Sequence, residues 1–256
     1  MGILQGKRVL VTGLTMASSI AYQVARVAQA EGAEVVVSNF GRALNLTRRV
    51  VQRLDPAPAV IELDVTDAGH LARLADQLRE SLGGLDGLVH SVAYANPERA
   101  LGGNFLSTEW EDVATSVRVS AYSLAELVRA CQPVIAPGAA VVGLTFDASV
   151  SWPAYDWMGV SKAALESVSR YLARYLGPQG VRCNIVSAGP INSIAKQSIP
   201  GVEGLDQLWS ERAPLGWDPE DAEPTARAVV ALLSDWFPST TGEIVHVDGG
   251  LHSTGA

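Results

Sequence analysis

Short runs of β-branched residues alternate with helical segments along the whole chain, and this alternation limits the fold more than any other feature. The runs are apolar throughout rather than every second residue, which is typical of strands buried on both faces. They lie at residues 8–12, 34–38, 60–64, 87–91, 139–145, 181–187 and 243–247. Apolar residues recur at helical spacing between them, at residues 18–31, 43–54, 68–82, 108–131, 157–176 and 219–235. The pattern predicts a Rossmann-like, doubly wound parallel seven-stranded sheet with helices on both faces.

Composition narrows the class of protein further. Hydrophobic residues make up 48% of the 256 residues, and no linker or repeat divides the chain, so one domain spanning residues 1–256 is predicted. A net charge of -8 argues against nucleic acid or an anionic membrane as partner. No apolar run reaches the roughly 18 residues of a membrane span, and no signal peptide is recognisable, so a cytoplasmic protein is expected.

Metal-binding spacings are missing from the sequence. Cys131 and Cys183 form no Cys-x-x-Cys pair, and the four histidines are scattered. We therefore expect no metal and two reduced thiols, with His90 and His246 as satisfied groups of the core.

The turn after the first strand is a candidate phosphate site. It keeps Gly13 of the Gly-x-Gly-x-x-Gly pattern but not the later glycines, and Ser19 and Ile20 open the following helix. Backbone N–H groups at such a helix start bind phosphate. An ordinary capped turn explains the same residues equally well.

The ends of the next three strands carry further candidate cofactor contacts. Phe40 is expected to pack on adenine or ribose, and Arg42 either meets a 2′-phosphate or is solvated, which leaves NADH and NADPH open at this point. Asp64 is expected to accept from the adenine amino group, with Val65 packing nearby. The alternative is that Asp64 or Asp67 caps the following helix. Small residues after the fourth strand, Ser91 and Ala93 among them, let a flat cofactor approach the backbone.

The pair Tyr155-x6-Lys162 carries the strongest chemical signal. Tyr155 precedes a helix that follows the fifth strand, and Lys162 lies in the second turn of that helix. An ammonium there favours the phenolate and bonds a ribose hydroxyl, while the phenol donates to a substrate oxygen that gains charge. The alternative is an interface tyrosine beside a surface lysine.

A glycine-bearing apolar stretch follows the sixth strand, at about residues 191–217. Such composition suits a mobile lid over an apolar ligand, and a subunit contact is the alternative. Its apolar residues include Ile194, Ile199, Val202, Leu205 and Leu208.

Five stretches together resemble the NADH-dependent enoyl-acyl-carrier-protein reductases of the short-chain dehydrogenase/reductase superfamily. They are GKRVLVTGLTMASSIAYQVA (6–25), LDGLVHSVAYA (85–95), PAYDWMGVSKAALE (153–166), GVRCNIVSAGPI (180–191) and TGEIVHVDGG (241–250). Ordinary superfamily members use Tyr-x3-Lys and a serine where residues 141–143 stand here. The segment 146–158 is most similar to actinobacterial enoyl reductases, with Phe146 where many others carry a second tyrosine. The lid is shorter than in the mycobacterial enzyme.

The resemblance implies a role for each candidate residue. Tyr155 would bond the thioester oxygen of an enoyl-acyl-carrier protein or enoyl-coenzyme A, Lys162 the nicotinamide ribose, and Phe146 would shape the catalytic pocket. NADH is implied rather than NADPH, because Arg42 has no basic neighbour. A cytoplasmic homotetramer is also implied. The remaining cofactor contacts would be Gly13, Ser19, Ile20, Phe40, Asp64, Val65, Ser91, Ala93, Ile191 and Ser193, and the acyl contacts Tyr94, Met158, Ile199 and Leu205.

Three other functions remain open from the sequence. A paralogue in specialised metabolism would share the fold, the cofactor and the catalytic pair but act on a different acyl group. A 3-oxoacyl or carbonyl reductase is disfavoured by the missing serine and the x6 spacing. A cofactor-binding protein without catalysis is disfavoured by the presence of both Tyr155 and Lys162.

Overall fold

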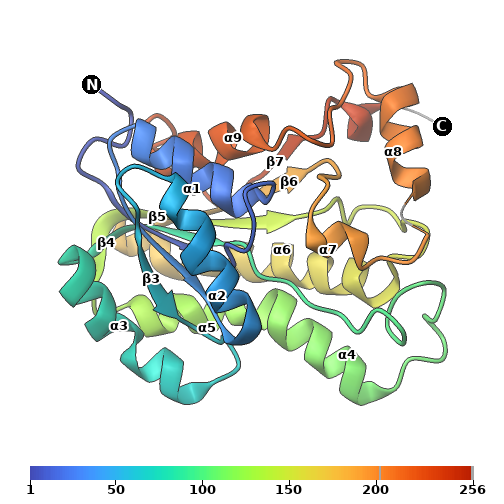
Figure 1. Cartoon of the computed structure of the whole chain (residues 1–256), viewed down its shortest axis with the longest axis horizontal. Coiled ribbons are helices and arrows are strands. Elements are labelled where there is room, and N and C mark those ends of the chain that lie inside the picture. The colour runs from blue at the N-terminus through green and yellow to red at the C-terminus, as the bar shows by residue number, and fades with distance from the viewer. Residues whose placement is uncertain (202, 255–256) are drawn as a thin grey trace.

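Seven parallel strands form one sheet in the computed structural model, which describes residues 1–201 and 203–254 (Figure 1). The strand order is β3-β2-β1-β4-β5-β6-β7, and every neighbouring pair is parallel. This confirms the predicted fold class. The strands are β1 Arg8–Thr12, β2 Glu34–Asn39, β3 Ala59–Glu62, β4 Leu85–His90, β5 Ile135–Thr145, β6 Arg182–Ala188 and β7 Ile244–Val247.

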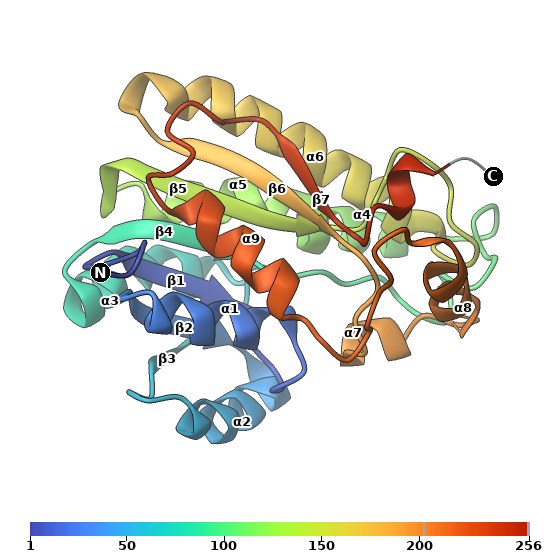
Figure 2. The ribbon, with the colours of Figure 1, turned by 90° about the horizontal axis from the view of Figure 1, so that it is seen from above.

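Helices cover both faces of the sheet. Helices α1 and α9 lie side by side over one face, and α3, α5 and α6 cover the other (Figures 1 and 2). The helices are α1 Ile20–Ala30, α2 Gly41–Val50, α3 Ala68–Leu82, α4 Trp110–Val117, α5 Ser123–Cys131, α6 Asp156–Leu176, α7 Ile194–Gln197, α8 Glu203–Arg212 and α9 Glu223–Leu233. None of the helices in the described ranges is long and apolar enough to span a membrane.

The core divides into one layer on each side of the sheet because successive strand side chains point in opposite directions. In β1, Val9 and Val11 pack with Val24 of α1, while Leu10 packs with Leu124 of α5. All of these side chains are fully buried. The continuous apolar runs of the sequence therefore reflect burial on both faces.

The direction in which successive strands are added to the sheet reverses between β1 and β4, which are parallel neighbours. From β1 the chain runs to β2 and β3 on one side, and it then crosses to β4 and continues toward β7 on the other. The loops leaving the carboxyl ends of β1 and β4 consequently diverge, and ligands of such sheets bind in the crevice between them.

Three predicted segments differ from the structure. The helix expected at 108–131 begins at Trp110 and is interrupted by a π-helical turn, Arg118–Tyr122, that packs on α6. The helix expected from residue 219 begins at Glu223, because the side chains of Asp218 and Asp221 accept backbone N–H groups and favour turns there. The lid contains two helices, α7 and α8, instead of irregular chain.

Candidate active site

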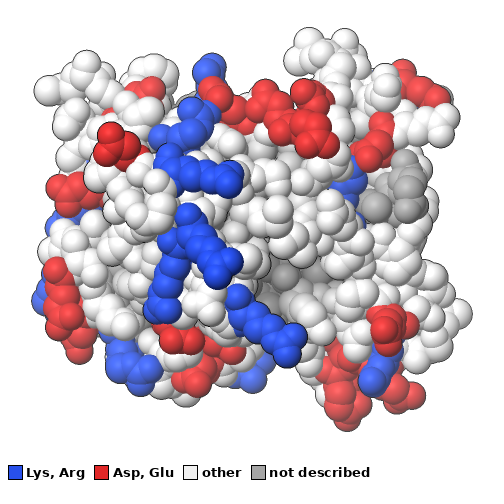
Figure 3. All heavy atoms as spheres, in the orientation of Figure 1, with Lys and Arg blue, Asp and Glu red and all other residues white. Residues whose placement is uncertain are grey.

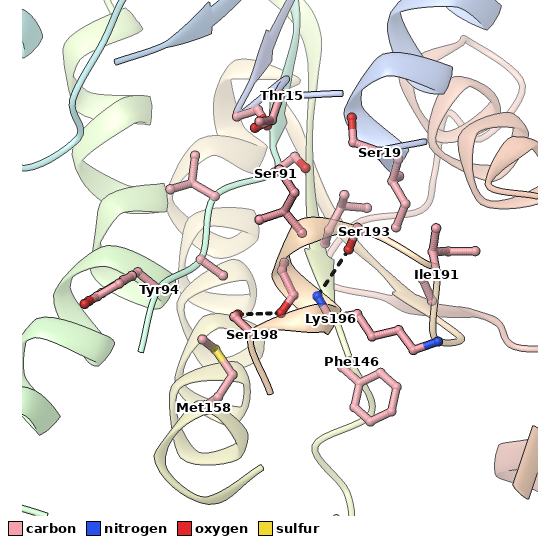
Figure 4. A pocket seen from close by; sticks show the side chains of 18 of the residues that line it. Thr15, Ser19, Ser91, Tyr94, Phe146, Met158, Ile191, Ser193, Lys196 and Ser198 are labelled. Carbon is pink, nitrogen blue, oxygen red and sulfur yellow. Dashed lines mark hydrogen bonds between the residues drawn. The ribbon is translucent and has the colours of Figure 1, made fainter. Parts of the chain in front are cut away.

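A cavity of about 510 Å³ opens at the carboxyl ends of the central strands. Its walls are the turn between β1 and α1, the segments that follow β2 to β6, the first half of α6, and the lid (Figure 4). This is the crevice that the strand order creates.

The structure brings all but one of the predicted site residues to this cavity. The exception is Asp64, whose Oδ1 accepts from the backbone N and the Oγ1 of Thr66, at 2.8 and 2.7 Å. Asp67, not Asp64, caps α3 by accepting from the backbone N of His70. The residues that line the cavity are Gly13, Ser19, Ile20, Phe40, Val65, Ser91, Ala93, Tyr94, Phe146, Tyr155, Met158, Lys162, Ile191, Ser193, Ile199 and Leu205.

The turn after β1 is fixed by Gly13 and by a residue that the sequence analysis missed, Asn39. Gly13 has φ +74°, and a Cβ added there would lie 2.0 Å from the backbone oxygen of Ser91. No other residue fits. Asn39 Nδ2 donates to the backbone oxygen of Leu14 at 2.8 Å and to Thr15 Oγ1 at 3.2 Å. The sequence feature that could have indicated this role of Asn39 is a neutral amide at the end of β2, where an acidic residue is common.

The N-terminus of α1 is suited to an anion. Ser19 caps the helix by accepting from the backbone N of Tyr22 at 3.2 Å, and the first turn contains no acidic residue. Ser18, Ser19 and Ile20 all line the cavity. The positive end of the helix dipole is therefore available to a phosphate group.

Lys162 is a buried cation in the cavity wall. Its side chain donates from Nζ to the backbone oxygen of Leu144 at 3.0 Å. Burial lowers the pKa of Lys162 to about 8, an effect that the nearby carboxylate of Glu166 partly opposes. An ammonium has three donors, so this hydrogen bond leaves two for other acceptors.

Tyr155 lines the cavity just before α6 begins, and its side chain is also buried. Burial raises the pKa of the Tyr155 phenol above its ordinary value. The hydroxyl is therefore protonated at neutral pH, and it acts as a hydrogen-bond donor.

An aromatic cluster surrounds Tyr155. Phe146, which follows β5, packs against the rings of Tyr155, Trp152 and Trp209, with centroids 5.2, 5.2 and 5.5 Å away. Trp209 comes from α8, so the cluster joins the cavity wall to the lid. Burial desolvates the phenol, which is the physical reason for its raised pKa.

Two backbone positions beside Tyr155 are strained. Ala154 has φ 61° and Asp156 has φ 39°, and among the described residues they are the non-glycine positions with positive φ. Each such position costs on the order of 1–3 kcal/mol, and such strain concentrates at functional sites. Nothing in the sequence pattern indicated it.

The lid contains an ion pair that the sequence analysis also missed, in which Lys196 is buried and Asp206 is partly exposed. Ser193 caps α7, and Lys196 reaches from α7 to the side chains of Asn192 and of Asp206 in α8. Lys196 lines the cavity while its side chain stays buried (Figure 4). The sequence feature that could have indicated this ion pair is a single lysine among apolar lid residues. Val202, named above as a lid residue, lies outside the described residues.

The histidines behave differently from one another. His90 is fully buried, as expected, and its Nε2 lies 2.7 Å from Ser123 Oγ, but its Nδ1 has no partner in the described part of the chain. The expectation for His246 is wrong: it is partly exposed and stacks on His252 with ring centroids 3.8 Å apart. No group of three or more residues that could hold a metal is found within residues 1–201 and 203–254.

Basic side chains gather over α2, on the face that contains the hollow next to the lid (Figure 3). They include the exposed Arg42, Arg48 and Arg49 of α2. Arg42 itself does not line the cavity, whereas Phe40, two residues earlier, does and is 44% exposed.

Comparison with known proteins agrees with this arrangement. A family model described as enoyl-(acyl carrier protein) reductase matches residues 13–252. The chain belongs to this family. It is 44% identical to the NADH enoyl-[acyl-carrier-protein] reductase of Mycolicibacterium smegmatis, with 97% of each chain covered. It is 45% identical to the enzyme so named from Mycobacterium avium, again with 97% of each covered. Identity to the Aquifex aeolicus relative is 37%, over 100% of this chain and 94% of that one.

Family membership, predicted from five stretches of sequence, is thus confirmed. The matched range begins at Gly13 and ends at His252, so it contains every predicted site residue of this enoyl-(acyl carrier protein) reductase family member.

Proposed function

We propose that this protein is an NADH-dependent enoyl-acyl-carrier-protein reductase. It reduces the trans-2 double bond of an enoyl thioester to the saturated acyl thioester during fatty-acid elongation. The observation that carries the proposal is the pairing of buried Tyr155 and buried Lys162 on one cavity at the carboxyl ends of the strands, under an apolar lid. Family membership supports the same reaction.

The residues of the cavity fit NADH. Gly13, Ser19 and Ile20 at the α1 N-terminus would hold the diphosphate, with Ser193 on its other side. Phe40 and Val65 would pack at the adenine, and Ser91 and Ala93 would lie along the ribose. Ile191 would contact the carboxamide of the nicotinamide.

The charges that line the cavity favour NADH over NADPH. Its lysine and arginine residues, among those described, are Lys162 and Lys196, from α6 and α7. Arg42 lies outside the lining, so no cation of the wall stands beside Phe40 to bind a 2′-phosphate.

NADH, when bound, would supply a hydride for the β-carbon of the enoyl thioester, and a proton taken up at the α-carbon would complete the saturated thioester. Tyr155 would donate a hydrogen bond to the thioester oxygen, on which negative charge develops between these two events. Because the phenol is buried and stays protonated, this bond would be stronger than in water. Lys162 would hold the ribose hydroxyls with the donors that Leu144 leaves unused.

Apolar side chains would form the acyl-binding part of the cavity. Phe146 shapes the wall beside Tyr155, and the acyl chain would contact Met158, Tyr94, Ile199 and Leu205. The acyl group would be carried by acyl-carrier protein or coenzyme A. We further propose a cytoplasmic homotetramer whose subunit is one domain, residues 1–256, with a lid at about 191–217.

Turnover of thioesters tests the proposal. NADH oxidation would be followed with crotonyl and dodecenoyl thioesters, beside a 3-oxoacyl thioester, NADPH, and the variants Tyr155→Phe and Lys162→Ala. We expect turnover of the enoyl thioesters only, and a loss of roughly 10²–10³ in kcat for Tyr155→Phe, the effect of removing one donor to a developing oxyanion. Tight NADH binding without turnover of either enoyl thioester would overturn the proposal.

A further inference from the structure

The loop that precedes α4 is tied to the chain at Tyr155 by the side chain of Asp156. Asp156 Oδ2 accepts from the backbone N of Gly103 at 2.7 Å and from the backbone N of Asn104 at 3.0 Å. Gly102 and Gly103 have φ +77° and +92°, the conformation that turns successive N–H groups toward one acceptor. One carboxylate oxygen thus holds the turn at residues 102–104.

Backbone and ring contacts strengthen this connection on both sides of Tyr155. The backbone N of Gly102 donates to the oxygen of Ala154 at 2.9 Å, and the backbone N of Trp157 donates to the oxygen of Ala100 at 3.2 Å. Trp157 Nε1 donates to the backbone oxygen of Phe105 at 3.0 Å, and the two rings stack at 4.9 Å. The loop therefore contacts Ala154 and Asp156, which flank Tyr155, and also Trp157.

The loop in turn forms part of the cavity. Ala100 and Leu101 are buried in one apolar cluster with Tyr155 and Met158, and Leu101 lines the cavity. Releasing the turn would therefore loosen both the wall and the tyrosine.

We propose that Asp156 is a positioning residue, whose carboxylate ties the 102–104 turn to the strained chain at Tyr155 and so fixes the phenol against the cavity wall. The kinetic part of this proposal rests on the proposed function, whereas the structural part does not.

Two substitutions separate the role of the acceptor from that of the backbone. Asparagine tolerates positive φ and keeps one side-chain oxygen, so Asp156→Asn retains the acceptor and removes the charge. Glycine tolerates positive φ and has no acceptor, so Asp156→Gly releases the turn without added backbone strain. Asp221→Gly is a control, since Asp221 accepts from the backbone N of Glu223 and does not line the cavity.

Hydrogen exchange tests the tie itself. The amides of Gly103 and Asn104 should exchange at least about tenfold faster in Asp156→Gly, the factor that corresponds to one lost hydrogen bond to a charged group. Exchange in Asp221→Gly should match the wild type, and exchange in Asp156→Asn should lie between the wild type and Asp156→Gly, because a weaker, neutral acceptor remains. Unchanged exchange in Asp156→Gly would show that the carboxylate does not hold the turn.

Kinetics and carbon-13 NMR of the tyrosine ring test the effect on Tyr155. We expect kcat to fall about tenfold in Asp156→Gly and to be restored in Asp156→Asn, with the Kd for NADH unchanged. The resonance of Tyr155 is the one that is missing from the spectrum of Tyr155→Phe. Its titration should give a Tyr155 pKa nearer the ordinary value of about 10 in Asp156→Gly than in the wild type. Faster exchange with unchanged kcat and unchanged titration would overturn the positioning role. If the wild type reduces no enoyl thioester, the proposed function fails, while exchange and titration still decide this proposal.

Discussion

The ring of Phe146 meets the ring of Tyr155 edge to face, with centroids 5.2 Å apart and an interplanar angle of 61°. Phe146 directly follows β5 and Tyr155 directly precedes α6, so this contact closes the loop between strand and helix. Trp152 lies within that loop and packs on Phe146 as well. The tyrosine is thus held by the ring of Phe146 and, through the chain that follows it, by the side-chain hydrogen bonds of Asp156.

Replacing Phe146 by leucine should impair catalysis without affecting the cofactor. The lost edge-to-face contact is worth about 0.5–1.5 kcal/mol, so kcat/KM should fall up to about tenfold as Tyr155 gains freedom. Steady-state kinetics with an enoyl thioester would measure the fall, and Phe146→Tyr, which keeps the ring, serves as the control. Equal kcat/KM in wild type and Phe146→Leu would contradict the expected role.

Replacing Lys162 by methionine should stabilise the protein when NADH is absent, in a manner that depends on pH. The pKa of Lys162 falls from 10.5 to about 8 on folding, so the unfolded state binds more protons between those values, and the wild type gains stability as pH rises through them. Below about pH 8 the methionine variant avoids a desolvation cost of about 3 kcal/mol but loses a hydrogen bond to Leu144 worth about 1 kcal/mol.

The net advantage of about 2 kcal/mol for Lys162→Met should therefore shrink above pH 8 and, near pH 10.5, give way to a disadvantage of about 1 kcal/mol from the lost hydrogen bond to Leu144. Urea unfolding of both proteins at a series of pH values would measure it. A difference that stays constant from pH 7 to pH 10 would show that Lys162 is not buried as a cation.

Substituting Gly189 by alanine should displace the rings of Trp209 and Trp217 in the lid. A Cβ at Gly189 would lie 2.7 Å from the Trp217 ring and 2.8 Å from Trp209 Nε1, and neither ring has a flexible end to move aside. Overpacking of this kind costs about 1–3 kcal/mol, so Tm should fall and tryptophan fluorescence should shift. Gly177→Ala, where an added Cβ meets nothing within 4 Å, is the control.

Breaking the ion pair between Lys196 and Asp206 should loosen the lid. Asp206→Asn removes the countercharge of the buried Lys196 ammonium and leaves it with neutral acceptors, whereas Lys196→Met removes the lysine charge altogether. We expect Asp206→Asn to raise the KM for a long-chain enoyl thioester several-fold, and Lys196→Met to be milder. A double-mutant cycle read by KM and by hydrogen exchange of α7 would measure the coupling. Additive effects would indicate that the two helices are not held by this pair.

Local sequence signals located most of the secondary structure, because strands buried on both faces must be apolar and helices need caps. Ser19 and Asp67 cap α1 and α3 with their side chains. The errors occurred where short-range hydrogen bonds compete with a helix, as at Asp218 and Asp221 before α9, or where packing on α6 widens one helical turn. The periodicity of apolar residues in the sequence indicates neither of these effects.

The sequence by itself determined the order of strands and helices and the residue types at the strand ends, since hydrophobic burial and the chirality of β-α-β crossovers leave few arrangements open. Only the tertiary structure decided that Lys196 reaches across to Asp206. It also decided that Asp156 binds a loop more than fifty residues earlier in the chain. A polar side chain can bond any partner that folding brings within about 3 Å, and that choice depends on long-range packing, which no local pattern records.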